Sequence, residues 1–258
     1  MKRDVWIIGL VALLLGVVLG QLGFFDVQRL GKGLLNLGRF AGEMVPPDMG
    51  VLPVAGKALL ETVQMSFAGT VLGFLISLPL SILGTRRLFP EPVPALARLI
   101  AAAVRTIPVL LWAIIFVILV GLGPLAGTLG ITVYTVGYLA KIYAELFEGT
   151  DPEVLEAVRG VGASRIHLVR FVVLPEGANA LVAQLLFMLE YNIRASSVLG
   201  FVGAGGIGFV MQVYLETLDY QRLATLLLLI LVVVLVMDGI SGWLRKHFLL
   251  AAHTNGRI

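Results

Sequence analysis

Residues 223–237 read LATLLLLILVVVLVM, a run that is almost wholly aliphatic. A helix needs about 20 mostly apolar residues to cross a bilayer, and this run with its flanks, residues 221–244, reaches that length. The whole chain of 258 residues has the same character, with 59% hydrophobic and 14% charged residues. Soluble domains are roughly half apolar and about a quarter charged, so the composition excludes an ordinary water-soluble globule.

Other uncharged or weakly charged runs predict further membrane spans. The run 106–140 is long enough for two spans, separated by a break near Gly121, Gly123 and Pro124. The first span, 5–25, is longer than the core of a typical signal peptide, and no A-x-A-like cleavage site follows it. We therefore expect an all-α, polytopic membrane protein with about six transmembrane helices, at 5–25, 62–85, two within 106–140, 177–199 and 221–244.

The positions of lysine and arginine predict the orientation of these spans. If the N-terminus lies inside, thirteen of the 19 basic residues fall in inner segments and six fall in outer ones. Cytoplasmic loops carry the excess of basic residues, so both termini are expected in the cytoplasm.

The chain divides into three predicted parts. Residues 1–58 hold the first span and an outer amphipathic segment that lies along the membrane interface, because Val27, Leu30 and Leu34 recur at helical spacing with basic residues between them. Residues 59–248 form the membrane core with five spans. Residues 249–258 form a cytoplasmic tail.

Several kinds of chemistry are excluded by what the sequence lacks. There is no cysteine, and the three histidines are well separated, so we expect no thiol nucleophile, no metal site and no cofactor. No phosphate-binding loop of the G-x-x-x-x-G-K-[ST] type occurs, and no catalytic residues stand out, so the chain is not expected to be an enzyme. The basic residues are scattered and not gathered on one polar face, which argues against nucleic acid as a partner.

The most informative polar stretch is residues 151–175, DPEVLEAVRGVGASRIHLVRFVVLP. Asp151 can cap a short helix, and Gly160 and Gly162 would end it in a turn. A second helix would start at Ser164 and lead back to the membrane at the Leu-Pro pair. A helical hairpin between two spans makes a protruding loop, which by itself is most simply a solvated connector.

This stretch resembles the cytoplasmic loop signature of the permeases of ABC transporters. The signature has Glu-Ala-Ala, then Gly, then Ile-x-Leu-Pro, and this chain has Glu156-Ala157-Val158, Gly162 and Val172-Val173-Leu174-Pro175. Val158 and Val172 depart from the pattern but keep its apolar character. The resemblance implies that the loop 150–175 holds the coupling helix that seats in a groove of the ATP-hydrolysing subunit. The implied coupling residues are Glu156, Ala157 and Gly162, with Arg159 and Ser164 as neighbours.

A second stretch, residues 190–208, reads EYNIRASSVLGFVGAGGIG. Glu190 and Arg194 are four residues apart on a helix and can pair, which lowers the cost of charge at membrane depth, either for function or as a purely structural salt bridge. The glycines that follow suit a bent or re-entrant segment whose amides could contact an anion, or they serve only close helix packing. The candidate residues of a substrate pathway are Glu190, Arg194, Ser196, Gly203, Gly205 and Gly206.

The same stretch resembles the segment after the fifth helix in the permeases of phosphonate-type importers, as do Arg105-Thr106-Ile107-Pro108 and Glu61-Thr62. The resemblance covers about residues 60–245. It implies a permease subunit of an ATP-driven ABC importer in the bacterial cytoplasmic (inner) membrane, which translocates phosphonate, phosphite or a phosphate ester by alternating access. The open alternatives are a permease for methionine or another small solute, and an ion-coupled secondary transporter.

The resemblance also implies partners. They are two ATP-binding cassette ATPase subunits, a periplasmic or lipid-anchored solute-binding protein, a second copy of the chain in a homodimer, and the lipid bilayer.

Overall fold

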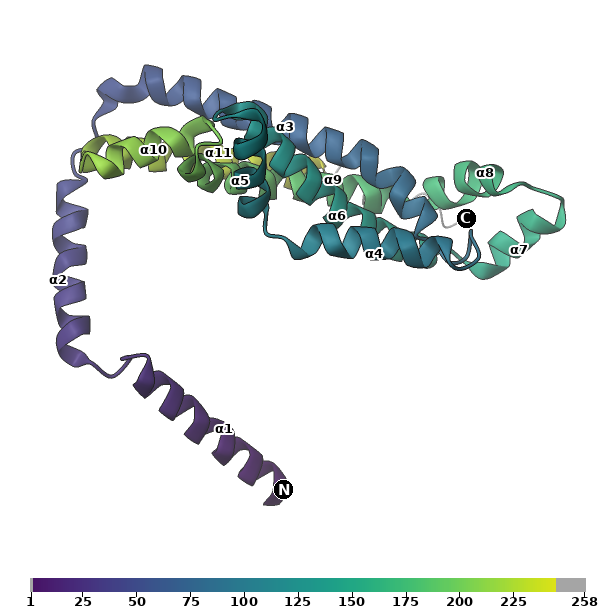
Figure 1. Ribbon diagram of the computed structural model, residues 1–258, viewed down its shortest axis with the longest axis horizontal. Coiled ribbons are helices and arrows are strands. Elements are labelled where there is room, and N and C mark those ends of the chain that lie inside the picture. Colours follow the sequence, from purple (N-terminus) through teal and green to yellow (C-terminus); the bar gives the residue numbers. More distant parts are fainter. Residues whose placement is uncertain (1, 245–258) are drawn as a thin grey trace. The chain divides into compact units, whose positions relative to one another are not determined.

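The computed structural model describes residues 2–244, with side chains from Trp6 onward. Every regular element in this part of the chain is helical (Figure 1). The elements are α1 (Lys2–Gln21), α2 (Val27–Glu43), η1 (Met49–Val51), α3 (Leu52–Leu83), α4 (Val93–Thr106), α5 (Val109–Val120), α6 (Pro124–Glu148), α7 (Pro152–Gly160), α8 (Arg165–Leu168), η2 (Val169–Val173), α9 (Leu174–Leu199), η3 (Gly200–Val202), α10 (Gly206–Glu216) and α11 (Tyr220–Leu244). The predicted all-α class is confirmed.

The chain divides into two compact units at Pro47 and Asp48. The first unit holds α1, most of whose described apolar side chains are exposed, and α2. Asp26 caps α2 by accepting a hydrogen bond from the amide of Arg29, and α2 has no buried residue. The helix predicted in the amphipathic segment is therefore present, but α3 begins at Leu52, inside the range 26–58. The predicted tail, 249–258, lies outside the described residues.

The second unit is a helical bundle built on α3, α6 and α9, which pack against one another (Figure 1). The short helices α7 and α8 lie at one end of this bundle, and α10 lies at the other. The elements α4 and α5 pack on α6, and α11 packs on α9. The bundle thus presents two different ends, one with the polar 150–175 loop and one with the glycine-rich segment.

The number of spans differs from the sequence prediction. Among the described residues, four helical stretches are long and apolar enough to cross a membrane: Met49–Leu83, Pro124–Glu148, Arg165–Val202 and Tyr220–Leu244. A fifth crossing results if α4 and α5, which meet at an angle of 86°, form one broken span. The apolar part described in α1, Trp6–Gln21, is shorter than these stretches.

The break between α4 and α5 explains much of this difference. Pro108 has no amide hydrogen and disfavours a helical conformation at the preceding residue, and Ile107 is indeed extended, with φ −84° and ψ 122°. The run 106–140 therefore does contain the predicted break at Gly121–Gly123. Its first helix, α5, has only 12 residues and needs α4 to complete a crossing.

Close contact between α3 and α6 depends on glycine. A Cβ atom added to Gly69 would lie 2.6 Å from Cγ2 of Ile131, and one added to Gly73 would lie 2.5 Å from Cβ of Thr135. Both distances are far below van der Waals contact. The two glycines, four residues apart, thus form the packing face that small-xxx-small spacing commonly provides in membranes.

Asp48 ties the start of α3 to the start of α11. Its carboxylate accepts hydrogen bonds from the amide of Gly50 (2.8 Å) and from Nε of Arg222 (3.1 Å), and its carbonyl accepts one from the hydroxyl of Thr225 (2.8 Å). The bonds from Gly50 and Arg222 lower the pKa of the Asp48 carboxyl below its usual value. Asp48 therefore remains a carboxylate, and an ion-pair partner, at neutral pH.

We predict that Gly73→Ala destabilises the bundle, because the new methyl group would overlap Thr135. Overpacking of this kind costs about 1–3 kcal/mol. The apparent Tm of the purified chain in detergent should fall by several degrees. The matched control is Gly56→Ala in the same helix, where nothing lies within 4 Å of the added Cβ. Equal melting of the two variants would contradict the packing role.

Candidate functional site

The predicted coupling loop forms the expected hairpin. Asp151 caps α7 by accepting a hydrogen bond from the amide of Glu153 (2.9 Å), and α7 ends at Gly160. Gly162 follows with φ +86°, a backbone conformation that favours glycine. Ser164 caps α8, since its hydroxyl accepts from the amide of His167 and also contacts Nδ1 of that ring at 2.6 Å. Gly162 and Ser164 therefore shape the turn between the two helices.

The second helix of the hairpin does not end at Leu174-Pro175. Instead α8 runs through a π-helical turn, η2, directly into α9, giving one helical stretch from Arg165 to Val202. Proline lacks the amide that would bond the carbonyl one turn earlier, and a π turn just before it changes the hydrogen-bond pattern there. The loop is thus a rigid continuation of the α9 span.

The hairpin has a buried side and an exposed side. Leu155 of α7 and Leu168 of α8 are 2% and 1% exposed, and they belong to a core cluster with Leu88. Glu156 and Ala157 are exposed. Two large apolar side chains of the same hairpin are also exposed, Val161 at 84% and Ile166 at 77%.

Arg159 makes a contact within this chain, and its coupling role stays a prediction. Its guanidinium donates a hydrogen bond to the carbonyl of Arg87, and the Arg87 guanidinium donates one to the carbonyl of Thr150. These bonds connect α7 to the loop between α3 and α4. Arg159 therefore helps to fix the position of α7 relative to the loop between α3 and α4.

Glu190 and Arg194 form the predicted ion pair, with 2.6 Å between Oε1 and Nη2. The two side chains differ in exposure: that of Glu190 is 10% exposed, and that of Arg194 is 46% exposed. Phe187, about two turns before Arg194, and Val198, about one turn after it, are also exposed on α9. One face of α9 thus combines apolar side chains with a paired arginine.

Sequence reasoning missed a buried polar cluster beside this pair. The amide nitrogen of Asn192 donates to the hydroxyls of Thr70 (2.8 Å) and Thr135 (3.0 Å), and the hydroxyls of Ser66 and Ser196 are 2.7 Å apart. The cluster joins α3, α6 and α9. Among the described residues, Oδ1 of Asn192 has no hydrogen-bond partner. The repeated four-residue spacing of small polar residues in α3 and α9 is the signal that could have revealed it.

In the glycine-rich segment, two of the amides that could contact an anion already have acceptors within the chain. The amide of Gly206 donates to Oε1 of Glu61 (2.8 Å), and the amide of Ile207 donates to the hydroxyl of Thr62 (2.8 Å). Glu61 and Thr62 therefore satisfy the first turn of α10, where backbone donors have no partner within the helix. These two amides already have acceptors from α3.

The glycines themselves permit close packing. Gly203, Gly205 and Gly206 have φ values of +81°, +82° and +71°. A Cβ atom on Gly205 would lie 2.6 Å from Oε1 of Glu61, and one on Gly208 would lie 2.0 Å from the carbonyl oxygen of Ser197. The packing interpretation therefore accounts for these positions, and a role in a substrate pathway stays a prediction.

Among the described residues, no group of three or more His, Cys, Asp or Glu residues could hold a metal ion.

Comparisons with known proteins agree with this architecture. Residues 69–249 match the family described as binding-protein-dependent transport system inner membrane component. The phosphite transport system permease protein PtxC of Stutzerimonas stutzeri is 39% identical over 245 residues, which covers 93% of this chain and 89% of that protein. The phosphate-import permease protein PhnE of Mycolicibacterium smegmatis is 36% identical and covers 79% of this chain and 39% of that protein.

A solved structure shows the same fold. The MetNI methionine ABC transporter in inward-facing conformations aligns with a TM-score of 0.68 at 23% identity, covering 77% of this chain and 98% of the compared chain. The family match extends over more than half of the sequence and includes most of the bundle and the 150–175 hairpin. This chain therefore belongs to the family of binding-protein-dependent transport system inner membrane components, the membrane-spanning subunits of ABC transporters.

Proposed function

We propose that the chain is the permease of an ATP-driven importer that translocates a phosphorus oxyanion: phosphonate, phosphite or a phosphate ester. The observation that carries this proposal is the 39% identity to a phosphite permease along nearly the whole of both chains. A second relative, the putative phosphite transport system permease HtxC, is 36% identical over 85% of this chain. The likeness to the methionine transporter is at 23% identity and concerns the fold alone.

The exposed side of the coupling hairpin is the proposed docking surface for the ATPase subunits. Exposed apolar side chains rimmed by polar residues commonly mark contact surfaces, and Val161 and Ile166 are such side chains in the hairpin that carries Glu156. The bonds of Arg159 and Arg87, together with buried Leu155, would pass a displacement of α7 to α3 and α6. ATP-driven closure of the partner subunits would thereby rotate the bundle as a rigid body.

The exposed face of α9 is the proposed contact with a second copy of the chain. A charged side chain at membrane depth almost always faces protein or a water-filled cavity, and Arg194 is half-exposed in the single chain. Pairing two chains through this face would remove both arginines from lipid. It would also place them near a shared pathway, into which a solute-binding protein would release its ligand.

The proposed orientation has both termini in the cytoplasm and the coupling hairpin on the same side. The basic residues Arg86, Arg87, Arg159 and Arg165 cluster at the hairpin end of the bundle, as the positive-inside rule requires of the cytoplasmic side. The ATPase subunits would then meet α7 in the compartment that contains ATP.

We predict that the solute-binding protein of this system selects a phosphorus oxyanion. A thermal-shift screen tests this by measuring the Tm of the purified solute-binding protein with methylphosphonate, phosphite, phosphate or methionine. A ligand that binds only the folded state raises the Tm, and the shift grows with the logarithm of the ligand concentration divided by Kd. Stabilisation by a phosphorus oxyanion is expected. Stabilisation by methionine alone would contradict the proposed substrate class.

We predict that Glu156→Lys impairs coupling without unfolding the chain, because Glu156 is exposed. A lysine would face the groups that the partner subunit presents to a carboxylate, and like-charge contact at an interface costs several kcal/mol. Ligand-stimulated ATPase activity of the reconstituted complex should therefore fall about tenfold or more. The control is the same change at exposed Glu43, in the other unit. Full stimulation in the Glu156 variant would exclude this residue from the docking surface.

We predict that Arg194→Gln reduces uptake of phosphite into proteoliposomes about tenfold or more, since a charge-assisted contact to an oxyanion is worth about 1.5–3 kcal/mol. Arg194→Lys keeps the charge but removes the planar fork, and should retain part of the activity. Melting temperatures of both variants separate a transport defect from misfolding. Unchanged uptake in a well-folded Gln variant would remove Arg194 from the pathway.

A further inference from the structure

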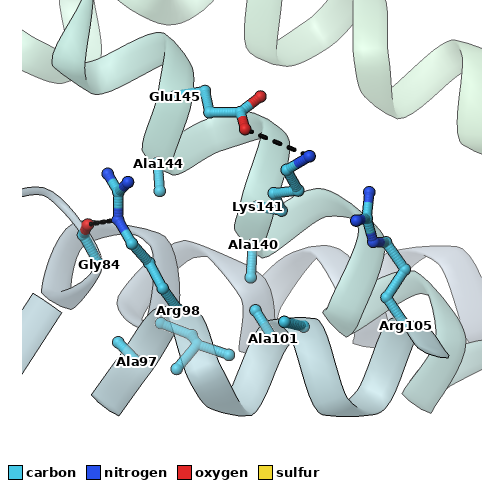
Figure 2. A pocket seen from close by; sticks show the side chains of 11 residues that line it. Gly84, Ala97, Arg98, Ala101, Arg105, Ala140, Lys141, Ala144 and Glu145 are labelled. Carbon is cyan, nitrogen blue, oxygen red and sulfur yellow. Dashed lines mark hydrogen bonds and ion pairs between the residues drawn. The ribbon is translucent and has the colours of Figure 1, made fainter. Parts of the chain in front are cut away.

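A cavity of about 190 Å³ lies between α4 and α6, beside the last turn of α3 (Figure 2). Its walls are made by small residues, Ala97 and Ala101 of α4 and Ala140 and Ala144 of α6. We call it the α4–α6 pocket. It is smaller than the roughly 300–1,000 Å³ of pockets for drug-sized ligands, so it suits a small ion or a single headgroup.

Three cations line this pocket, and within the described part of the chain two of them have a carboxylate partner. Arg98 forms an ion pair with Glu148 and also donates from Nε to the carbonyl of Gly84 (2.7 Å). Lys141 pairs with Glu145 at 3.4 Å. Among the described residues, the guanidinium of Arg105 has neither an acidic partner nor a hydrogen bond.

The backbone at Arg105 is held firmly although its side chain is not. A Cβ atom added to Gly137 would lie 2.9 Å from the backbone nitrogen of Arg105, so α4 and α6 touch at this point. The indole nitrogen of Trp112 donates to the carbonyl of Val104 at 3.1 Å. Figure 2 shows the side chains of Arg105 and Lys141 extending on the same side of the pocket. Two cations from two helices thus face one small space.

The Lys141–Glu145 pair does not prevent Lys141 from binding a ligand. Its side chains are 41% and 54% exposed, and exposed ion pairs of this type contribute about 0–1 kcal/mol. An anion between Lys141 and Arg105 would replace that weak contact with charge-assisted hydrogen bonds. A guanidinium fork with an ammonium beside it matches a tetrahedral oxyanion that has several oxygens.

We propose that the α4–α6 pocket binds a phosphorus oxyanion through Arg105 and Lys141. The pocket lies at the end of the bundle that carries α7, away from Glu61 and the glycine-rich segment. The oxyanion is either a free ion, such as phosphate or phosphite, or the phosphate of an anionic lipid. Binding here requires no transport, so the proposal stands or falls separately from the proposed function.

The test is equilibrium binding of radiolabelled inorganic phosphate to the full chain in phosphatidylcholine nanodiscs, without ATPase or binding protein. Saturable binding is expected. Arg105→Gln should weaken it about tenfold or more, and Lys141→Gln should also weaken it, because the ammonium is lost and Glu145 is left unpaired beside the anion. The control is Lys32→Gln, which removes an exposed charge from the other unit.

A second variant narrows the α4–α6 pocket without changing any charge. Ala102 lines the pocket and is exposed, so Ala102→Leu can narrow the pocket without being forced into the core. It should also weaken phosphate binding about tenfold. Unchanged binding in both Arg105→Gln and Ala102→Leu would overturn the proposal, as would the absence of saturable binding to the unaltered chain.

Nanodiscs that contain phosphatidic acid distinguish the two sources of the oxyanion. Loss of phosphate binding to the unaltered chain in these nanodiscs assigns the pocket to a lipid headgroup. Undiminished phosphate binding in these nanodiscs assigns it to a free ion.

Discussion

The close approach of α3 to α6 is the contact on which the rest of the bundle depends. Lipid is as apolar as the helices, so no hydrophobic driving force holds the helices together, and close van der Waals packing must do so. Gly69 and Gly73 allow that approach. It brings Thr70 of α3 and Thr135 of α6 within hydrogen-bond distance of Asn192 on α9. A bulkier residue at either glycine would separate the donors and acceptors of this buried cluster.

The helix α3 also connects the two ends of the bundle. Near its start, Glu61 and Thr62 accept hydrogen bonds from the first amides of α10. At its end, the carbonyl of Gly84 accepts one from Arg98 of α4, and the following loop is bonded to Arg159 of α7. Buried backbone groups require such partners, so the glycine-rich segment and the hairpin are both fixed to one helix. A rigid displacement of α3 would therefore move both the glycine-rich segment and the hairpin.

Local patterns in the sequence predict much of this structure, whereas long-range partners leave no local signal. The caps at Asp151 and Ser164 and the Glu190–Arg194 pair involve residues within four positions, so spacing alone predicts them. The acceptor for Gly206 lies on a helix 145 residues earlier, and nothing near that glycine indicates Glu61. The shortness of α5 was missed for a different reason: hydropathy measures the length of a run but not the bend that Pro108 causes.

The exposed faces of α11 and α9 call for different surroundings. On α11 the exposed side chains include Leu228, Leu231 and Leu235, which lipid can cover without cost, and the same helix also exposes Asp238. On α9 the exposed face includes Arg194, whose pairing with Glu190 leaves nearly half of the side chain uncovered. A charge this exposed in hydrocarbon is expensive, and the cost falls only if protein or water covers it. The aliphatic side chains of α11 therefore suit lipid, whereas Arg194 on α9 requires protein or water around it.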